Sequence, residues 1–277
     1  MCRSYLWEGE MMTIVKYSLE EGVFATSAYG DQWAGPDGDR LTIALLLLQS
    51  ETPSSIQIES FVESLEYTPS APVSSIIEST TDWKVLPDGE FQLITSSSSL
   101  IVGISKKNNI AQWPDFPSEK SFDEEQRKAI NEAWKKEVSG VSQGAYVSQS
   151  QHMLSMPSRL GLHAQEDDSI ILWPPRQLNN EGERIPPVSS KLDNNALILT
   201  WTKLSALGAP SEFSLRAPLL GGVSTVLVEF TSGPKGVFML ADDEDGEPSI
   251  DQTVSFEVRR LYGQDNLIHY GLKALLN

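Results

Sequence analysis

The most constraining feature of this sequence is a series of five strand-like segments that begins at residue 196. Apolar and polar residues alternate along them, which is typical of half-buried β-strands. The intervening SGPKG (232–236) and GQDN (263–266) are typical of tight turns. The five segments are ALILTWTKL (196–204), LGGVSTVLVEF (220–230), KGVFMLAD (235–242), TVSFEVRRLY (253–262) and NLIHYGLKAL (266–275).

Five short strands in so short a stretch predict a small closed barrel with Greek-key connections, of which the OB-fold is the commonest five-stranded example. We therefore predict a protein that is mainly β with some α. The expected regions are a β-rich α+β domain at 1–140, a helical arm and connector at 141–195, and an OB-fold barrel at 196–277. The connector is low in charge and has five prolines: Pro157, Pro174, Pro175, Pro186 and Pro187.

The first 140 residues also contain strand patterns. Residues 12–28 predict two strands separated by a turn at Gly22, and GPDGD (35–39) predicts a solvated turn. LTIALLLLQ (41–49) predicts a buried strand; a short helix is the alternative, because Leu and Ala favour helices. Further strands are expected at 56–67, 73–78, 91–95 and 100–105, with Ser96–Ser99 as an exposed turn.

The clearest helix is predicted over residues 122–138. Ser121 or Asp123 can cap it, and acidic residues in its first turn and lysines in its last complement the helix dipole. Four residues fall on one face and predict the buried side: Ile130, Ala133, Trp134 and Val138.

Charge excludes two classes of function. The chain has 277 residues, with 21 Lys and Arg against 38 Asp and Glu, so the formal net charge is −17. Residues 1–150 carry 11 basic and 22 acidic residues, which accounts for −11 of that total. Binding to nucleic-acid phosphates or to anionic membranes needs a clustered basic surface, so both are disfavoured.

Cysteine and histidine are scarce. Cys2 is the only cysteine, and the three histidines are His152, His163 and His269, none at HxxxH or HxxH spacing. A disulfide within the chain and a zinc site with several thiolates are therefore excluded, and we expect no metal.

The beginning of the chain has no apolar run of the about 7–15 residues that a signal peptide needs. The longest apolar stretch, residues 43–48, is far shorter than the ~20 residues that span a bilayer. We therefore expect a cytoplasmic protein in which residues 1–10 have little structural role.

Residues 153–277 resemble the OB-fold acyl-CoA-associated proteins that accompany thiolases and hydroxymethylglutaryl-CoA synthases. In that family a helical arm precedes a rubredoxin-like zinc ribbon, and an OB barrel follows. MLSMPSRLGLHAQEDDSIILWPPRQL (153–178) resembles the arm, the first cysteine pair and a Pro-Pro-Arg segment. ALILTWTKLSALGAPSEFSLRAPLLGGVSTVLVEF (196–230) resembles the first barrel strands, and residues 235–275 resemble the closing strands with a Tyr-Gly-Lys-type ending at Tyr270, Gly271 and Lys273.

All four positions of the family's zinc-binding cysteines are empty here. The ribbon segment is instead QEDDSIILWPPRQLNNEGERIPPV (165–188). The resemblance therefore implies a degenerate ribbon that prolines and packing hold without zinc. VFATSAYGDQWAG (23–35) is similar to a Tyr-Gly-Asp-Gly segment of hydroxymethylglutaryl-CoA synthases, which implies a degenerate thiolase-type remnant in the first 140 residues.

Catalysis of the thiolase type is not expected from this chain. That chemistry needs a cysteine nucleophile activated by histidine partners. Cys2 stands near the start of the chain, and no histidine occurs before His152.

Trp173, Pro174, Pro175 and Arg176 are the candidate contact with CoA or with a partner. Arg176 can pair bidentately with a phosphate, and Trp173 can stack on adenine. The alternative is a packed connector with a solvated arginine.

Three other features are expected to have no special function. Arg259 and Arg260 are predicted as ordinary residues of the barrel surface, since neighbours on a strand face opposite sides. DDEDGE (242–247) lacks the ligand order of a calcium loop and predicts a solvated acidic loop. His269 has no predicted nucleophile beside it, so a packing role at the core edge or surface is expected.

The expected function is that of a non-catalytic accessory or scaffold subunit. The resemblance implies a thiolase-superfamily partner, acetoacetyl-CoA thiolase or hydroxymethylglutaryl-CoA synthase, with CoA or acyl-CoA bound in the complex and no cofactor of the chain itself. One alternative is an OB-fold protein that binds single-stranded nucleic acid, which the 6 basic and 10 acidic residues of 197–277 disfavour. Another is an acyl-CoA enzyme with unrecognised residues in its N-terminal half.

Overall fold

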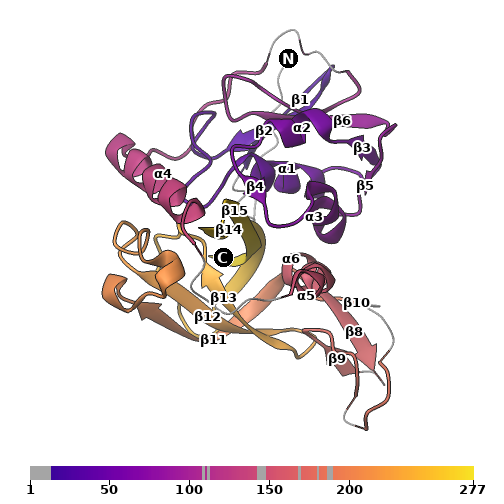
Figure 1. Cartoon of the computed structure of the whole chain (residues 1–277), viewed down its shortest axis with the longest axis vertical. Helices are drawn as coiled ribbons and strands as arrows, with labels where there is room; N and C mark the ends of the chain where they lie inside the picture. The colour runs from indigo at the N-terminus through magenta and orange to yellow at the C-terminus, as the bar shows by residue number, and fades with distance from the viewer. Residues whose placement is uncertain are drawn as a thin grey trace. The chain divides into compact units, whose positions relative to one another are not determined.

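The computed structural model describes residues 14–107, 110, 113–141, 148–167, 170–179, 181–185 and 190–277. The protein is mainly β with some α, as predicted (Figure 1). The chain divides into two units. Unit 1 comprises Met1–Val141 together with Arg259–His269, and unit 2 comprises Ser142–Val258 together with Tyr270–Asn277.

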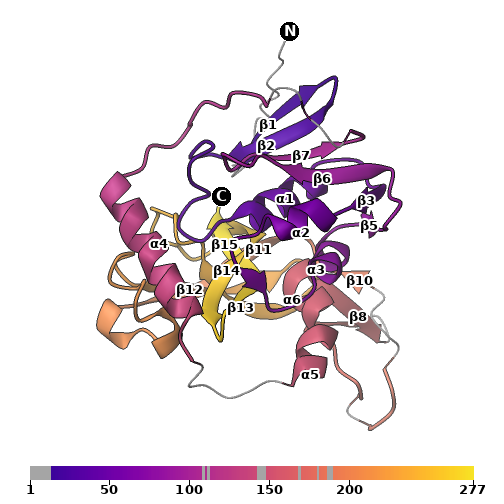
Figure 2. The ribbon, with the colours of Figure 1, turned by 45° about the horizontal axis from the view of Figure 1, so that its top comes forward.

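Unit 1 is built on a mixed six-stranded sheet with the order β1-β2-β7-β6-β3-β5, which can be followed in Figure 2. The neighbours β1–β2, β2–β7 and β6–β7 are antiparallel, whereas β3 runs parallel to both β5 and β6. The strands are β1 (Ile14–Leu19), β2 (Gly22–Ser27), β3 (Ser55–Gln57), β5 (Lys84–Val85), β6 (Phe91–Thr95) and β7 (Val102–Ser105).

The first two strands confirm the predicted pair and the turn between them, which lies at Glu20 and Glu21, directly before Gly22. Gly22 has φ +156°, and a Cβ atom there would lie 2.3 Å from the Ile104 carbonyl oxygen of β7. Glycine is therefore required, because the backbone of β7 approaches too closely for any side chain. The predicted strands at 91–95 and 100–105 are also confirmed, as β6 and β7.

The predicted buried strand at 41–49 is wrong, and its helical alternative is correct: α1 spans Arg40–Gln49. Asp39 caps it, with the carboxylate accepting from the Thr42 backbone N–H at 2.9 Å while the Thr42 hydroxyl accepts from the Asp39 N–H at 2.8 Å. This capping box stabilises a helix whose residues are buried on nearly every side, so the sequence shows no amphipathic period. The helix packs against β1, β2 and β7.

Two further predicted strands are helices. Of residues 56–67, only the beginning belongs to β3, and α2 (Glu59–Glu63) follows and buries Phe61. Residues 73–78 lie in α3 (Val73–Thr80), where Val73, Ile76 and Ile77 are buried at helical spacing. The apolar positions fit a period of 3.6 residues better than alternation.

The predicted helix at 122–138 is confirmed as α4 (Glu124–Val138). The Asp123 carboxylate caps it by accepting from the backbone N–H groups of Glu125 and Gln126, at 2.7 and 3.3 Å. All four residues of the predicted face are buried.

Unit 2 begins with two short helices, α5 (Gln149–Leu154) and α6 (Met156–Gly161). They are followed by a three-stranded antiparallel sheet of order β10-β8-β9, with β8 (His163–Asp167), β9 (Ile170–Leu172) and β10 (Ser190–Lys191). A helical arm and a small sheet thus occupy the connector.

The predicted five-stranded barrel is confirmed. Its strands are β11 (Asn195–Leu204), β12 (Val223–Phe230), β13 (Lys235–Leu240), β14 (Thr253–Gln264) and β15 (Leu267–Leu276). They follow the order β13-β12-β11-β14-β15, and parallel pairing of β13 with β15 closes the ring. This connectivity is that of an OB-fold. The last residues of β14, from Arg259 on, and the first residues of β15, up to His269, belong to unit 1. There β15 pairs in parallel with β4 (Thr68–Pro69).

No helix among the described residues is long and apolar enough to cross a membrane.

Candidate functional site

The first candidate residue, Trp173, lies directly after β9 and packs on aromatic side chains of the barrel. Its indole ring stacks on Phe238 with a centroid distance of 5.7 Å and an angle of 20°, and it meets Phe230 edge-on at 5.8 Å. The Nε1–H donates to the Ser158 carbonyl oxygen at 3.2 Å. One ring face and the polar edge of Trp173 are therefore used within unit 2, and the side chain is half-buried.

Gly236 of β13 makes room for this tryptophan. A Cβ atom at Gly236 would lie 2.7 Å from Cζ3 of Trp173 and 2.7 Å from Cε2 of Phe238. Any larger residue would push the indole away from the barrel, so glycine is needed for this contact.

The second candidate residue, Arg176, has a fixed backbone and an exposed side chain. Its backbone N–H donates to Oε1 of Gln165 at 2.7 Å, and Gln165 is buried on β8. The guanidinium is thus presented to solvent from an anchored turn. A planar, permanently charged group in that position can pair with a phosphate or carboxylate.

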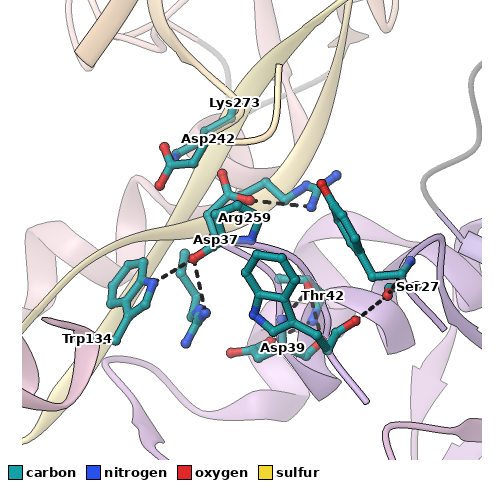
Figure 3. Close-up of polar contacts among 12 residues, drawn as sticks. Ser27, Asp37, Asp39, Thr42, Trp134, Asp242, Arg259 and Lys273 are labelled. Carbon is teal, nitrogen blue, oxygen red and sulfur yellow. Dashed lines mark hydrogen bonds and ion pairs between the residues drawn. The ribbon is translucent and has the colours of Figure 1, made fainter. Parts of the chain in front are cut away.

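A group of three charged side chains is buried elsewhere in unit 2. Arg216 and Lys273 are 1% and 0% exposed, and both pair with the Asp242 carboxylate, Arg216 at 2.8 Å. Figure 3 shows Asp242 beside Lys273. For Asp242 the prediction of a solvated acidic loop is wrong, because the two cations hold its carboxylate inside; Asp245 and Glu247 are exposed as predicted.

A second buried ion pair lies in unit 1, between Asp37 and Arg259 (Figure 3). The Asp37 carboxylate and the Arg259 Nη1 are 3.4 Å apart, and both residues are buried. The prediction of a solvated turn at 35–39 is therefore wrong, because a cation neutralises the aspartate inside the unit.

Arg260 is buried beside Arg259, so the prediction of ordinary barrel-surface residues is wrong for both. The Arg260 guanidinium lies 4.3 Å from the centre of the Trp134 ring of α4, which is the geometry of a cation–π contact. The Pro36 carbonyl oxygen accepts from Trp134 Nε1 at 2.7 Å and from Arg260 Nη2 at 3.4 Å. The 35–39 turn thus packs against α4 and the end of β14.

His269 and His152 are packed against other side chains. His269 stacks on Tyr262 with a centroid distance of 4.4 Å, which agrees with its predicted packing role. His152 on α5 lies 3.3 Å from the Arg159 guanidinium, and burial together with Arg159 lowers the pKa of His152. Arg159 also donates to the Tyr270 carbonyl oxygen at 2.6 Å.

The Ser96–Ser99 segment is only partly the exposed turn that was predicted. Ser96 is buried, whereas Ser97 and Ser98 are exposed. The carbonyl oxygens of Ser96 and Ser99 accept from the Arg40 guanidinium at 3.4 and 3.3 Å. The backbone of this segment therefore accepts hydrogen bonds from the Arg40 side chain.

In the part of the chain that the structure describes, no three His, Cys, Asp or Glu residues come together as a metal site. Cys2, Pro186 and Pro187 lie outside the described residues.

Sequence reasoning missed the buried charges because only one of them has a local signal. Lys273 interrupts an otherwise apolar strand, which indicates a buried cation with a partner. Asp37 and Arg216 lie in segments rich in Gly, Pro and Ser, where charged residues are ordinarily exposed.

The fold defines a class: a five-stranded barrel of OB topology, preceded by a helical arm and a three-stranded sheet. No protein-family model and no curated protein matches this chain. Among solved structures, one chain of the Ltp2-ChsH2(DUF35) aldolase is similar, with 14% sequence identity and a TM-score of 0.31. The match covers 48% of this chain and 97% of that chain.

Proposed function

We propose that this protein is a non-catalytic accessory subunit that binds an acyl-CoA-handling enzyme of the thiolase superfamily. It holds that complex together or shelters an acyl-CoA intermediate. The partner enzyme is acetoacetyl-CoA thiolase, hydroxymethylglutaryl-CoA synthase or both, and the chain has no cofactor of its own.

One observation carries this proposal. The helical arm (α5 and α6), the three-stranded sheet and the five-stranded barrel follow one another in the order that the sequence resemblance implies. The described part of the three-stranded sheet is supported by strand pairing and by the packing of Trp173 on Phe238. Fold alone does not establish function, and the partner must be tested directly.

Within this proposal, Arg176 is the residue that contacts CoA or the partner, and Trp173 is its positioning residue. The exposed guanidinium offers a bidentate donor set for the phosphates of CoA. Trp173 fixes the turn that carries Arg176 by stacking on Phe238, and within this proposal it is the residue that stacks on the adenine ring.

Capture from native cells tests the partner. We expect the tagged full-length chain to co-purify with a thiolase-superfamily enzyme that mass spectrometry identifies. Capture of no acyl-CoA-handling enzyme would overturn the proposal, as would acyl-CoA turnover by the purified chain alone.

Isothermal titration of the captured complex with CoA tests the contact. Arg176→Ala is expected to weaken CoA binding about 10- to 100-fold, because a charge-assisted hydrogen bond contributes roughly 1.5–3 kcal/mol. Arg184→Ala is the matched control, since Arg184 is another exposed arginine of the same connector. Equal affinities for the two variants would exclude Arg176 as the contact.

A further inference from the structure

The tip of the β14–β15 hairpin, residues 259–269, belongs to unit 1, although the rest of both strands belongs to unit 2. Its two-residue turn is formed by Asp265 and Asn266, which have φ angles of +52° and +63°. Two successive residues with positive φ are typical of the type I′ turn, and Asp and Asn tolerate this conformation. The tip is therefore a regular hairpin end with a defined backbone conformation.

The turn caps the C-terminal end of α4. The Asp265 N–H donates to the Gly140 carbonyl oxygen at 2.7 Å, and the Asn266 N–H donates to the Val138 carbonyl oxygen at 2.8 Å. The last four carbonyl groups of an α-helix have no partner within the helix, and residues that directly follow it often supply one. In α4 a segment distant in the sequence supplies this cap.

Gly263 brings the backbone of β14 against the same helix end. Gly263 is buried, and a Cβ atom there would lie 2.5 Å from Cγ2 and 2.9 Å from the backbone nitrogen of Val138. Its φ lies outside the left-handed region, so glycine is needed here for close approach and not for backbone conformation. Any side chain at this position would push the tip away from α4.

The tip also bonds to two other segments of unit 1. The Arg260 N–H donates to the Asp37 carbonyl oxygen at 2.9 Å, and the Ser70 N–H donates to the Ile268 carbonyl oxygen at 2.8 Å. The Arg260 side chain adds the cation–π contact with Trp134 of α4. Three segments that are far apart in the sequence thus obtain part of their bonding from one hairpin.

Packing against other elements keeps α4 helical. The helix has 15 residues, and an isolated helix of about 12–15 residues is marginal in water. The buried face of α4 includes Trp134 and Val138. Loss of the tip would remove Arg260 from the Trp134 ring and the cap from the Val138 carbonyl group. The C-terminal half of α4 would then lose much of the support that its length makes necessary.

We propose that the hairpin tip and α4 form one cooperative opening unit: α4 stays folded only while the tip is seated, and the two open together before the sheet of unit 1 unfolds. Proteins open in contiguous cooperative units with free energies of opening below that of global unfolding. The tip then acts as a latch on α4. The inference is independent of the proposed function, because it uses only contacts within unit 1.

Native-state hydrogen exchange of the full-length chain, followed by mass spectrometry at low urea concentrations, tests this proposal. We expect peptides covering Asp265 and Asn266 and peptides covering the end of α4 to exchange with one common free energy of opening. Peptides from β2 and β7 are expected to have a higher one, because they exchange only through global unfolding. Different free energies of opening for the tip and for α4 would overturn the proposal.

Gly263→Ala unseats the tip, and Gln264→Ala is the matched control. Gln264 is the next residue of β14, is half-buried, and makes no side-chain hydrogen bond with another residue in the part of the chain that the structure describes. From the cost of overpacking, we expect exchange about 5- to 100-fold faster in the tip and in α4 alike, with β2 and β7 unchanged. Faster exchange in the tip with α4 unchanged would refute the latch.

Ile130→Ala tests the coupling in the opposite direction, and it is the second variant should Gly263→Ala not fold. Ile130 is a fully buried residue of α4, and Gln126→Ala, at an exposed position of the same helix, is its control. Coupling between two sites is reciprocal, so we expect exchange in the tip to rise by the same factor as exchange in α4. Faster exchange in α4 with the tip unchanged would overturn the proposal.

Discussion

Both units of the molecule bury arginine against aspartate, and they do so for different structural purposes. In unit 1, Arg259 pairs with Asp37, a residue 222 positions earlier in the chain. In unit 2, Arg216 and Lys273 share the single carboxylate of Asp242. The first pair ties the end of a hairpin to a loop, and the second orients a loop on a barrel.

In both units a buried ion pair joins segments that are distant in the sequence, so buried charge positions these segments against one another. Arg259 Nη1 lies 3.4 Å from the Asp37 carboxylate, whereas Arg216 Nη1 lies 2.8 Å from the Asp242 carboxylate. Asp242 contacts two buried cations and lies closer to Arg216 than Asp37 does to Arg259, so we expect the larger loss when Asp242 is removed. Its removal takes a carboxylate away from Arg216 and Lys273, and removal of Asp37 takes one away from Arg259.

The largest effect is therefore expected for Asp242→Ala. Breaking a buried ion pair destabilises a protein by about 3–5 kcal/mol, and we expect the upper end of that range for the free energy of unfolding in urea. Asp245→Ala, an exposed residue of the same loop, should change it by less than about 0.5 kcal/mol. Equal losses for the two variants would contradict the assigned role of Asp242.

Asp37→Ala is expected to follow with a loss of about 3 kcal/mol, because Arg259 remains buried without this carboxylate. The double replacement Asp37→Leu/Arg259→Met should lose less than Asp37→Ala alone, since both members of the buried ion pair are then replaced by apolar residues. Urea unfolding measures both. A larger loss for Asp37→Ala than for Asp242→Ala would reverse the comparison between the units.

Gly236→Ala tests the aromatic packing of Trp173 in unit 2, and its effect can be compared with that of the buried ion group around Asp242. The added methyl would stand 2.7 Å from Trp173, and overpacking of this kind costs about 1–3 kcal/mol. We also expect a change in tryptophan fluorescence as the indole leaves Phe238. Gly208→Ala is the control, because the nearest atom to its Cβ is 3.7 Å away. An unchanged spectrum for Gly236→Ala would refute the stacking contact.

The smallest effect concerns His152, whose pKa is lowered by burial and by Arg159. The His152 imidazole therefore takes up a proton more readily in the unfolded chain than in the folded chain. Stability from this residue is complete above the ordinary histidine pKa of about 6.5, and it is lost as the pH falls below that value. His152→Gln should therefore show a smaller drop in melting temperature between pH 7.5 and pH 5.5 than the wild type does. An equal drop in the two proteins would show that other groups determine the pH dependence of the melting temperature, and it would contradict this prediction.

The barrel and α4 could be predicted because their signals are local and agree with one another. Alternation, turn residues and strand length coincide in residues 196–277, and caps, dipole charges and an apolar face coincide in residues 122–138. The strand prediction for the α1 segment was wrong because the segment is apolar throughout. A helix that is buried on all sides has no polar face, so its sequence shows no period of 3.6 residues. The Asp39–Thr42 capping box was the available signal.

The five barrel strands, their turns and the absence of a cysteine framework follow from the sequence alone, because each depends on residues close together or on simple counts. Tertiary structure alone decided that the 35–39 turn is buried, that Arg259 and Arg260 face inward and that Leu215 faces outward. It also placed residues 259–269 with the first 141 residues. The physical reason is that a charge is buried only where a distant partner or an aromatic face compensates its desolvation, and no local pattern encodes that partner.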